Sequence, residues 1–311
     1  MVKVFTPVKV GDIDPEIKII LDRREAARAA KDYALSDKLR DDLLSLGYEV
    51  QDRVGGYDLA KLGDREQKPR ASFLVLFGSG ENAPSAVDIY RQVFLQLGKR
   101  DLRLVLLTTP AGFQPNVDRV YGEIRDFLLA ALPDFNLTID IVPAHDRAAC
   151  DDDHLVAQLD SADIIFTGPG SPTYAAKQLR DTKMYTKIIA QVKNGSSLIL
   201  ASAATISFSR YALPVYEIYK VGEALHWQDG LNLYKEIWQE LTLIPHFNNT
   251  EGGAGLDTSY CYIGKSRAEI LLSRLPPTAR VMGLDEHTAL ILNRNTGEVV
   301  VRGKGKMHSV K

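Results

Sequence analysis

Hydrophobic residues recur with two different periodicities along the chain. Between residues 15 and 47 they recur at the three- and four-residue spacing of amphipathic helices, which predicts helices over residues 15–32 and 33–47. The apolar positions expected on their buried sides are Ile17, Ile20, Leu21, Ala27, Leu35, Leu39, Leu43 and Leu46. Gly47 suits the end of the second helix, and the Gly55-Gly56 pair predicts a β-hairpin over residues 48–59.

From residue 71 onward, short apolar runs alternate with amphipathic segments. The runs have no polar face, which is typical of strands buried on both sides of a parallel sheet. They are expected near residues 71–77, 102–108, 137–142, 163–167 and 196–201, with later short strands near 240–245 and 280–284. The fold class expected is α/β, a doubly wound and mainly parallel sheet preceded by a small helical segment plus hairpin. The expected domains are 1–67 and 68–311, joined by a polar linker within Lys61–Arg70.

Composition and charge narrow the class of function. The 311 residues carry a formal net charge of −2, which offers no drive toward nucleic acid for the chain as a whole. Cys150 and Cys261 make neither a CxxC motif nor a disulfide framework. The N-terminus lacks a signal-peptide core, and no apolar run is long enough for a membrane span, so a cytoplasmic location without membrane contact is expected. The histidines show no metal-ligand spacing, and neither a P-loop nor a full GxGxxG is present, so neither metal nor cofactor is expected.

Turn residues follow four of the expected strands, in the stretches GSGEN, TPAGFQPN, GPGSP and ASAAT. Ligands of doubly wound sheets bind beyond the carboxyl ends of the strands. Ser202 in the last stretch lies where a strand gives way to a helix, as the serine of a nucleophile elbow does. The alternative is a small residue at a buried strand end.

The order of GSGE, TPAGFQPN, TGPGSP, a serine at a strand end, PHF and GLDEHTAL resembles the dipeptidase E and cyanophycinase family of serine peptidases, within the class I glutamine amidotransferase-like, flavodoxin-like fold. The resemblance spans residues 73–310. It implies a nucleophile at Ser202, a base at His246 and an acid at Glu286. It also implies hydrolysis of small aspartyl or isoaspartyl peptides. In such a site backbone N–H groups hold the oxyanion, and those of Ala203 and Gly170 are the candidates, because Pro169 has none.

Several alternatives remain open. The family's elbow glycines are replaced by Leu200 and Ala204, and the acid could instead be Asp285, Glu217 or Glu223. Arg267 is a candidate to bind a substrate carboxylate, or it lies on a helix face. The hypotheses are therefore a serine peptidase or amidohydrolase, a catalytically silent binding member of the fold, and a translation-linked accessory.

The third hypothesis comes from RREAARAAKDYALSDKLRDDLLSLGYEVQD, residues 23–52, which resembles the C-terminal tail of cysteinyl-tRNA synthetases. No ATP-binding HIGH or KMSKS signature is present, so aminoacylation is not implied. Residues 1–70 carry fourteen Lys and Arg and fourteen Asp and Glu, so their formal charges cancel and provide no counterion release on tRNA. A structural arm is the alternative to tRNA contact through residues 1–67. A homodimer is a further expectation.

Overall fold

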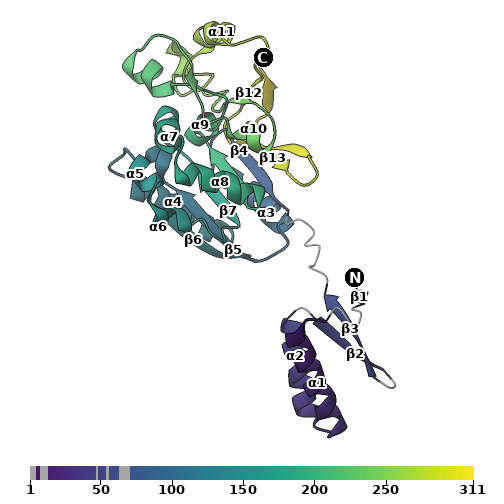
Figure 1. The fold of residues 1–311 in the computed structure, drawn as a ribbon. Helices are drawn as coiled ribbons and strands as arrows, with labels where there is room; N and C mark the ends of the chain where they lie inside the picture. Colours follow the sequence, from purple (N-terminus) through teal and green to yellow (C-terminus); the bar gives the residue numbers. More distant parts are fainter. Residues whose placement is uncertain (1–4, 8–12, 47, 54–55, 63–70) are drawn as a thin grey trace. The chain divides into compact units, whose positions relative to one another are not determined.

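The structure is a computed structural model that describes residues 5–7, 13–46, 48–53, 56–62 and 71–311. The contacts divide the chain into two compact units, Met1–Pro69 and Arg70–Lys311 (Figure 1). Each unit is described by itself. Gly47, Gly55 and most of the predicted linker lie outside the described residues. Its first two residues, Lys61 and Leu62, belong to a strand of the N-terminal unit.

The N-terminal unit packs two helices on a small antiparallel sheet. The helices are α1 (Pro15–Ala29) and α2 (Tyr33–Ser45), and the strands are β1 (Phe5–Pro7), β2 (Tyr48–Arg53) and β3 (Gly56–Leu62), in the order β1-β3-β2. The core of the unit consists of Ile17, Leu21, Leu43, Val50 and Leu59. The predicted helices and hairpin are confirmed, and β1 is an additional strand. Leu35 and Leu46, predicted on the buried side of α2, are 38% and 52% exposed; Leu35 lies in the first turn of the helix, and Leu46 follows its last residue.

An ion pair lies inside the N-terminal unit. The guanidinium of Arg24, whose side chain is only 1% exposed, donates to Asp52 over 2.8 Å, and Arg28 pairs with the same carboxylate over 2.9 Å. The hydrogen bond from Arg24 lowers the pKa of Asp52, against the opposing effect of partial burial. A charged group buried this deeply needs its partner, so the α1–β2 contact depends on Asp52.

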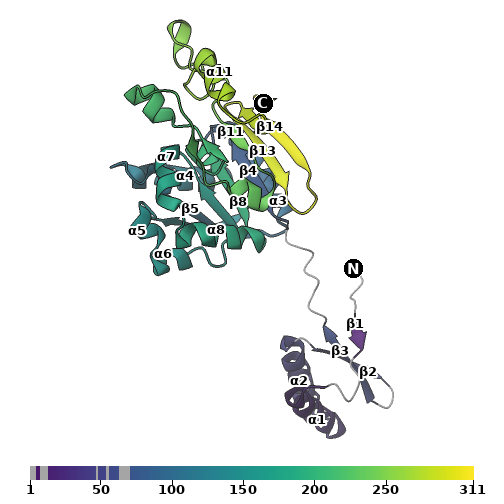
Figure 2. The same cartoon turned by 45° about the horizontal axis from the view of Figure 1, so that its top comes forward.

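A seven-stranded sheet organises the larger unit. Its order is β14-β13-β4-β8-β7-β5-β6, and β4, β8, β7, β5 and β6 run parallel while β13 and β14 are antiparallel at one edge (yellow in Figure 2). The strands are β4 (Phe73–Phe77), β5 (Asp101–Leu107), β6 (Asn136–Val142), β7 (Ile164–Thr167), β8 (Ser197–Ala201), β13 (Thr288–Asn293) and β14 (Val299–Gly303). The prediction of a mainly parallel α/β sheet is confirmed. The antiparallel strands β13 and β14 were not predicted as part of this sheet.

Alternate residues of each strand enter two separate hydrophobic clusters, which lie on opposite faces of the sheet. Phe73, Val75 and Phe77 of β4 share a cluster with α3 and α4, whereas Leu74 and Leu76 pack with α7 and α8. The connecting helices are α3 (Val87–Gln96), α4 (Val117–Ala131), α5 (Arg147–Cys150), α6 (Asp153–Ala157), α7 (Pro172–Leu179) and α8 (Lys183–Lys193). Because side chains alternate across a strand, wholly apolar runs are what a sheet covered on both faces requires. The sequence pattern missed α8.

A second, three-stranded sheet lies beyond the carboxyl ends of the first. Its order is β11-β12-β15, from β11 (Thr242–Ile244), β12 (Val281–Leu284) and β15 (Met307–Ser309). The chain passes from β12 of this sheet to β13 of the large sheet within residues 285–287. The remaining elements are η2 (Pro84–Ala86), η3 (Thr109–Ala111), α9 (Ala203–Ser207), β9 (Tyr211–Ala212), η4 (Glu217–Val221), β10 (Gln228–Asp229), α10 (Leu233–Ile237), η5 (Gly253–Gly255) and α11 (Lys265–Ser273). No helix among the described residues is long and apolar enough to cross a membrane.

Asp52→Ala should destabilise the N-terminal unit, because Arg24 keeps its buried charge without a partner. We expect the free energy of unfolding of this unit to fall by about 3 kcal/mol. Hydrogen exchange of the α1 and α2 amides in the full chain measures it. Asp58→Ala is the matched control: Asp58 pairs with Arg53 at the surface, and its loss should cost less than ~1 kcal/mol.

The effect of Asp52→Ala should also depend on pH. The pKa of Asp52 is lower in the folded chain than the ~3.9 of an unfolded aspartate. Its stabilisation is therefore complete above about pH 5 and declines as the pH falls through the folded value. Equal amide protection in wild type and D52A at pH 7 would contradict the assigned ion pair.

Candidate active site

Ser202 begins the turn between β8 and α9, at the carboxyl end of a central strand of the large sheet. Its backbone has φ 50° and ψ −111°, a conformation that is strained for any residue with a β-carbon. Three hydrogen bonds hold the turn: Ser202 N–H to Phe77 O (3.4 Å), Ala204 N–H to Gly168 O (3.3 Å) and Ile206 N–H to Ser202 O (3.3 Å). The backbone here is that of a nucleophile elbow.

The elbow forms without the glycines that flank the family's serine. Leu200 and Ala204 are both fully buried and belong to one hydrophobic cluster, on the face of the sheet that α7 and α8 cover. The methyl group of Ala204 is small enough for α9 to approach the strand, and the side chain of Leu200 fills the core. The residues that replace the glycines are therefore part of the packing and leave the turn of Ser202 in place.

His246 follows β11 and reaches Ser202 from the second sheet. Its Nε2 lies 2.9 Å from Ser202 Oγ. The backbone of His246 is also left-handed, with φ 48°, and it is held by His246 N–H to Gly78 O (3.1 Å) and Cys261 N–H to His246 O (3.1 Å). The imidazole is thus fixed from two loops before any substrate binds.

Glu286 lies where the chain passes from β12 to β13. Its Oε1 is 2.7 Å from His246 Nδ1 and accepts a second hydrogen bond from Asn249 Nδ2 (3.0 Å). The hydrogen bond with His246 lowers the pKa of the Glu286 carboxyl, although burial opposes the shift. A carboxylate accepts only, so the imidazole proton lies on Nδ1 and Nε2 is left to accept from Ser202.

The other three acidic candidates make different contacts. Asp285 accepts from the Lys306 N–H and pairs with His308 at 2.8 Å, while Glu217 accepts from Thr173. Glu223 lies 4.0 Å from His226. Among the four, Glu286 is the one whose carboxylate contacts His246.

Gly170 and Ala203 lie beside Ser202 and His246 around a cavity of about 360 Å³. β7 pairs with β8 so that Thr167 lies opposite Leu200, and the loop after β7 is therefore adjacent to the elbow. Within the described part of the chain, no protein acceptor is recorded for the N–H of Gly170 or Ala203, while those of Ser171 and Ala204 bond to Pro110 O and Gly168 O. Two unused N–H groups beside the serine can receive an oxyanion.

Sequence reasoning missed several residues around His246 and Glu286. Asn249, which is 1% exposed, and Asn248, whose Oδ1 accepts the Glu286 N–H (2.8 Å), orient the carboxylate. Tyr262 packs against the imidazole with ring centroids 5.7 Å apart, and its hydroxyl donates to Glu251 (3.0 Å). The two asparagines directly after PHF were the available signal.

Arg267 differs from the expectation of a substrate-binding residue. Its Nε donates to Ile263 O (2.5 Å) and its Nη2 to Tyr262 O (3.3 Å), and it does not belong to the wall of the cavity beside Ser202. The guanidinium caps the preceding turn because Arg267 lies one helical turn after Ile263, on α11. No group of three or more His, Cys, Asp or Glu side chains in the described ranges is arranged to hold a metal ion.

Comparison with known proteins assigns the two units to different relatives. The family model of the cysteinyl-tRNA ligase anticodon binding domain matches residues 10–57. The cysteine–tRNA ligase of Chlamydia trachomatis serovar A is 38% identical over 56 residues, which cover 18% of this chain and 12% of the ligase. That of Oenococcus oeni is 39% identical over 54 residues, 17% of this chain and 12% of the ligase. The chain thus spans about an eighth of these curated relatives, and the likeness of its N-terminal segment to the synthetase tail is confirmed.

The larger unit is similar to solved peptidase structures. A peptidase from an acI-B1 Actinobacterium aligns with a TM-score of 0.62 at 23% identity, over 79% of this chain and 93% of that one. A candidate Peptidase E protein from Listeria monocytogenes EGD-e aligns with a TM-score of 0.50 at 14% identity, over 76% of this chain and all of that one (100%). At this identity the likeness establishes the fold, and the expected peptidase E-like fold is confirmed.

Gly170→Ala should disrupt the loop that carries one of the two N–H groups. Gly170 has φ 145°, and a β-carbon there would lie 2.0 Å from Pro110 O. We expect the free energy of unfolding to fall by about 2 kcal/mol or more. Gly122→Ala is the control, since nothing lies within 4 Å of its added β-carbon, and alanine in α4 should stabilise by up to ~1 kcal/mol. Chemical denaturation measures both, and equal midpoints for wild type and G170A would contradict the close approach.

Proposed function

We propose that the protein is a serine-type peptidase or amidohydrolase, with Ser202 as nucleophile, His246 as general base and Glu286 as the orienting acid. The observation that carries this proposal is the continuous hydrogen-bonded series from Ser202 Oγ through both imidazole nitrogens to Glu286 Oε1, at 2.9 and 2.7 Å. Such a series on a strained elbow, beside a cavity, is more than a buried strand end requires.

The reaction follows from the roles of these atoms. Ser202 Oγ attacks the carbonyl carbon of the scissile amide as its proton passes to His246 Nε2. The carbonyl oxygen becomes an oxyanion, which the N–H groups of Gly170 and Ala203 stabilise. The protonated imidazole, stabilised by Glu286, then gives the proton to the departing amine nitrogen. A water molecule, which gives a proton to His246, then attacks the ester formed on Ser202. This step releases the carboxylic acid product and restores the serine.

For the substrate we propose small aspartyl or isoaspartyl peptides, on the resemblance to the dipeptidase E and cyanophycinase family. The cavity of about 360 Å³ beside Ser202 is of the size that accommodates a small ligand. A catalytically silent binding protein is the alternative. Reaction with a fluorophosphonate probe separates the two, because a silent serine does not form the covalent adduct.

A second candidate function rests on the match of residues 10–57 to an anticodon binding domain. We propose that this unit contacts tRNA. Because the formal charges of residues 1–70 cancel, binding would depend on specific contacts more than on counterion release. Salt-dependent tRNA binding by the full chain, compared with a chain that lacks residues 1–67, tests it. Equal affinity of the two chains would contradict the proposal.

Ser202→Ala and His246→Ala should each abolish most of the hydrolysis of aspartyl dipeptides and of β-aspartyl-arginine. We expect losses in kcat of at least ~10³-fold for either variant. The double variant should be little slower than either single one, because the two residues act as one unit. Equal rates in wild type and all three variants would rule out this nucleophile and base.

Glu286→Gln should lower kcat by about 10³- to 10⁴-fold with little change in KM. The amide no longer stabilises the protonated imidazole and does not secure the required tautomer. Glu223→Gln is the control, because the carboxylate of Glu223 lies beside His226, at 4.0 Å, and its change should leave the rate unchanged. Steady-state kinetics on one substrate measure both variants. An equal loss in E223Q would point to a general electrostatic effect instead.

A further inference from the structure

A second and larger cavity, of about 630 Å³, adjoins the one beside Ser202. The two share Tyr216 as a wall. Residues at the beginning of α7 line the two cavities in alternation. Gly170 and Pro172 line the cavity beside Ser202. Ser171 and Thr173 line the larger cavity. The proposed reaction makes no use of this larger cavity, here called the α7 cavity.

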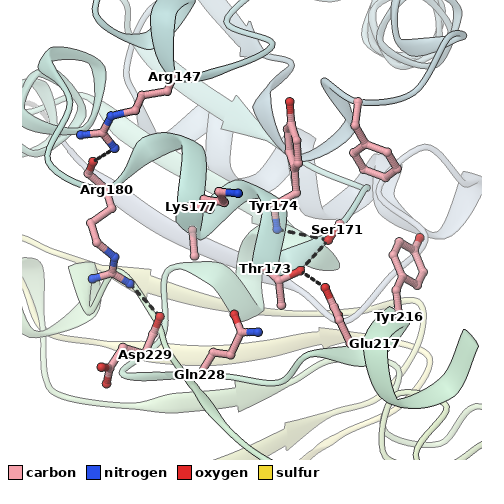
Figure 3. A pocket seen from close by; sticks show the side chains of 12 residues that line it. Arg147, Ser171, Thr173, Tyr174, Lys177, Arg180, Tyr216, Glu217, Gln228 and Asp229 are labelled. Carbon is pink, nitrogen blue, oxygen red and sulfur yellow. Dashed lines mark hydrogen bonds between the residues drawn. The ribbon is translucent and has the colours of Figure 1, made fainter. Parts of the chain in front are cut away.

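Positive charge gathers on one side of the α7 cavity, where Arg147, Lys177 and Arg180 lie (left and centre of Figure 3). Arg147 donates to Arg180 O (2.7 Å), and Arg180 donates to the carbonyls of Asp229 (2.7 Å) and Gly230 (3.0 Å). These contacts hold the two guanidinium groups through neutral carbonyls and leave their charge uncompensated. Among the described residues, no ion pair is recorded for any of the three cations.

The acidic residues of the same wall do not neutralise this charge. Asp229 is paired with Arg210 at 2.8 Å. Glu217 lies on the opposite side of the cavity beside Tyr216 in Figure 3 and accepts from Thr173 Oγ1 over 2.5 Å. The α7 cavity therefore has three cationic side chains and one carboxylate, that of Glu217, that is not paired with a cation. This excess of positive charge favours a ligand with more than one negative charge.

One carboxylate oxygen of Glu217 receives no hydrogen bond from the described residues. Its Oε2 is buried, and no hydrogen-bond donor in the described chain reaches it, although Oε1 is held by Thr173, which in turn contacts Ser171 (2.9 Å). A buried acceptor without a donor is costly, and such atoms are rare unless a ligand or water serves them. An N–H group of a ligand in the α7 cavity would satisfy it.

We propose that the α7 cavity is a subsite for an acidic extension of the peptide substrate. An N–H of the extension binds Glu217 near the shared wall, and its carboxylates bind Lys177 of α7, Arg180 directly after that helix and Arg147 of α5. A peptide suits both ends, because each residue supplies an N–H and an aspartate or glutamate adds the charge. This proposal rests on the proposed function and deepens it: the preferred substrate is an acidic peptide longer than a dipeptide.

The test uses the full chain with Ser202→Ala, which binds a substrate without cleaving it. Calorimetry compares tri-aspartate with Asp-Asn-Asn, which has the same shape without the two acidic side chains of its extension. We expect tri-aspartate to bind about tenfold more tightly, as one charge-assisted hydrogen bond would give. Lys177→Glu should remove this preference. Lys193→Glu makes the same charge change on α8, where Lys193 pairs with Glu236, and should retain it.

Two outcomes overturn the subsite: equal affinity of S202A for the two peptides, or equal loss of the preference in the K177E and K193E backgrounds. Glu217→Gln adds an independent arm: an amide NH2 in place of the carboxylate oxygen that lacks a donor cannot accept from the peptide, so the binding of both peptides should weaken. Turnover by the wild type is scored separately. A preference that depends on Lys177, without any hydrolysis, would leave the subsite standing and reject the peptidase. If the wild type hydrolyses both peptides at rates that depend neither on K177E nor on the charge of the peptide, the peptidase would stand and the subsite would be rejected.

Discussion

The carboxyl end of β4 is the point on which the arrangement of the larger unit depends. Phe77 O accepts from Ser202 N–H, Gly78 O accepts from His246 N–H (3.1 Å), and Gly78 N–H donates to Thr288 O (2.8 Å). Two consecutive residues thus bind the elbow, the histidine loop and the strand that follows Glu286. A β-carbon on Gly78 would lie 2.1 Å from Asp285 O, so only glycine permits this approach. The positions of Ser202, His246 and Glu286 relative to one another follow from this junction.

Strain is concentrated around the same junction. Ser202 and His246 both have left-handed backbones, and so do the three consecutive residues Tyr260, Cys261 and Tyr262, with φ of 54°, 60° and 66°. Each such residue costs of order 1–2 kcal/mol, which the well-packed surroundings must offset. The left-handed turn donates Tyr260 N–H to Phe247 O (2.9 Å) and Cys261 N–H to His246 O. These hydrogen bonds hold the backbone of His246, and with it the imidazole, in position despite the strain.

Helix α7 links the proposed chemistry to the proposed specificity. The loop before it carries Gly170, and Ser171 caps the helix by accepting from Tyr174 N–H (3.2 Å). Lys177 of the same helix and Arg180, the residue directly after it, line the α7 cavity. An eight-residue rigid element thus fixes the spacing between the proposed oxyanion donor and a cationic wall. A substrate that contacts both would be aligned by one helix, without a movement of loops.

The sequence by itself determined the alternation of strands and helices, because wholly apolar strands and 3.6-residue periodicity are local properties. It also indicated Ser202, His246 and Glu286 as candidates, because short motifs at strand ends resemble those of the dipeptidase E and cyanophycinase family. Only the tertiary structure decided which of four acids contacts His246, because that depends on how β12 passes into β13 across two sheets. The second sheet, the partners of Arg267 and the α7 cavity likewise depend on contacts between distant segments. The periodicity of a sequence does not predict such contacts, because they arise from packing and backbone hydrogen bonds between residues that are far apart in the chain.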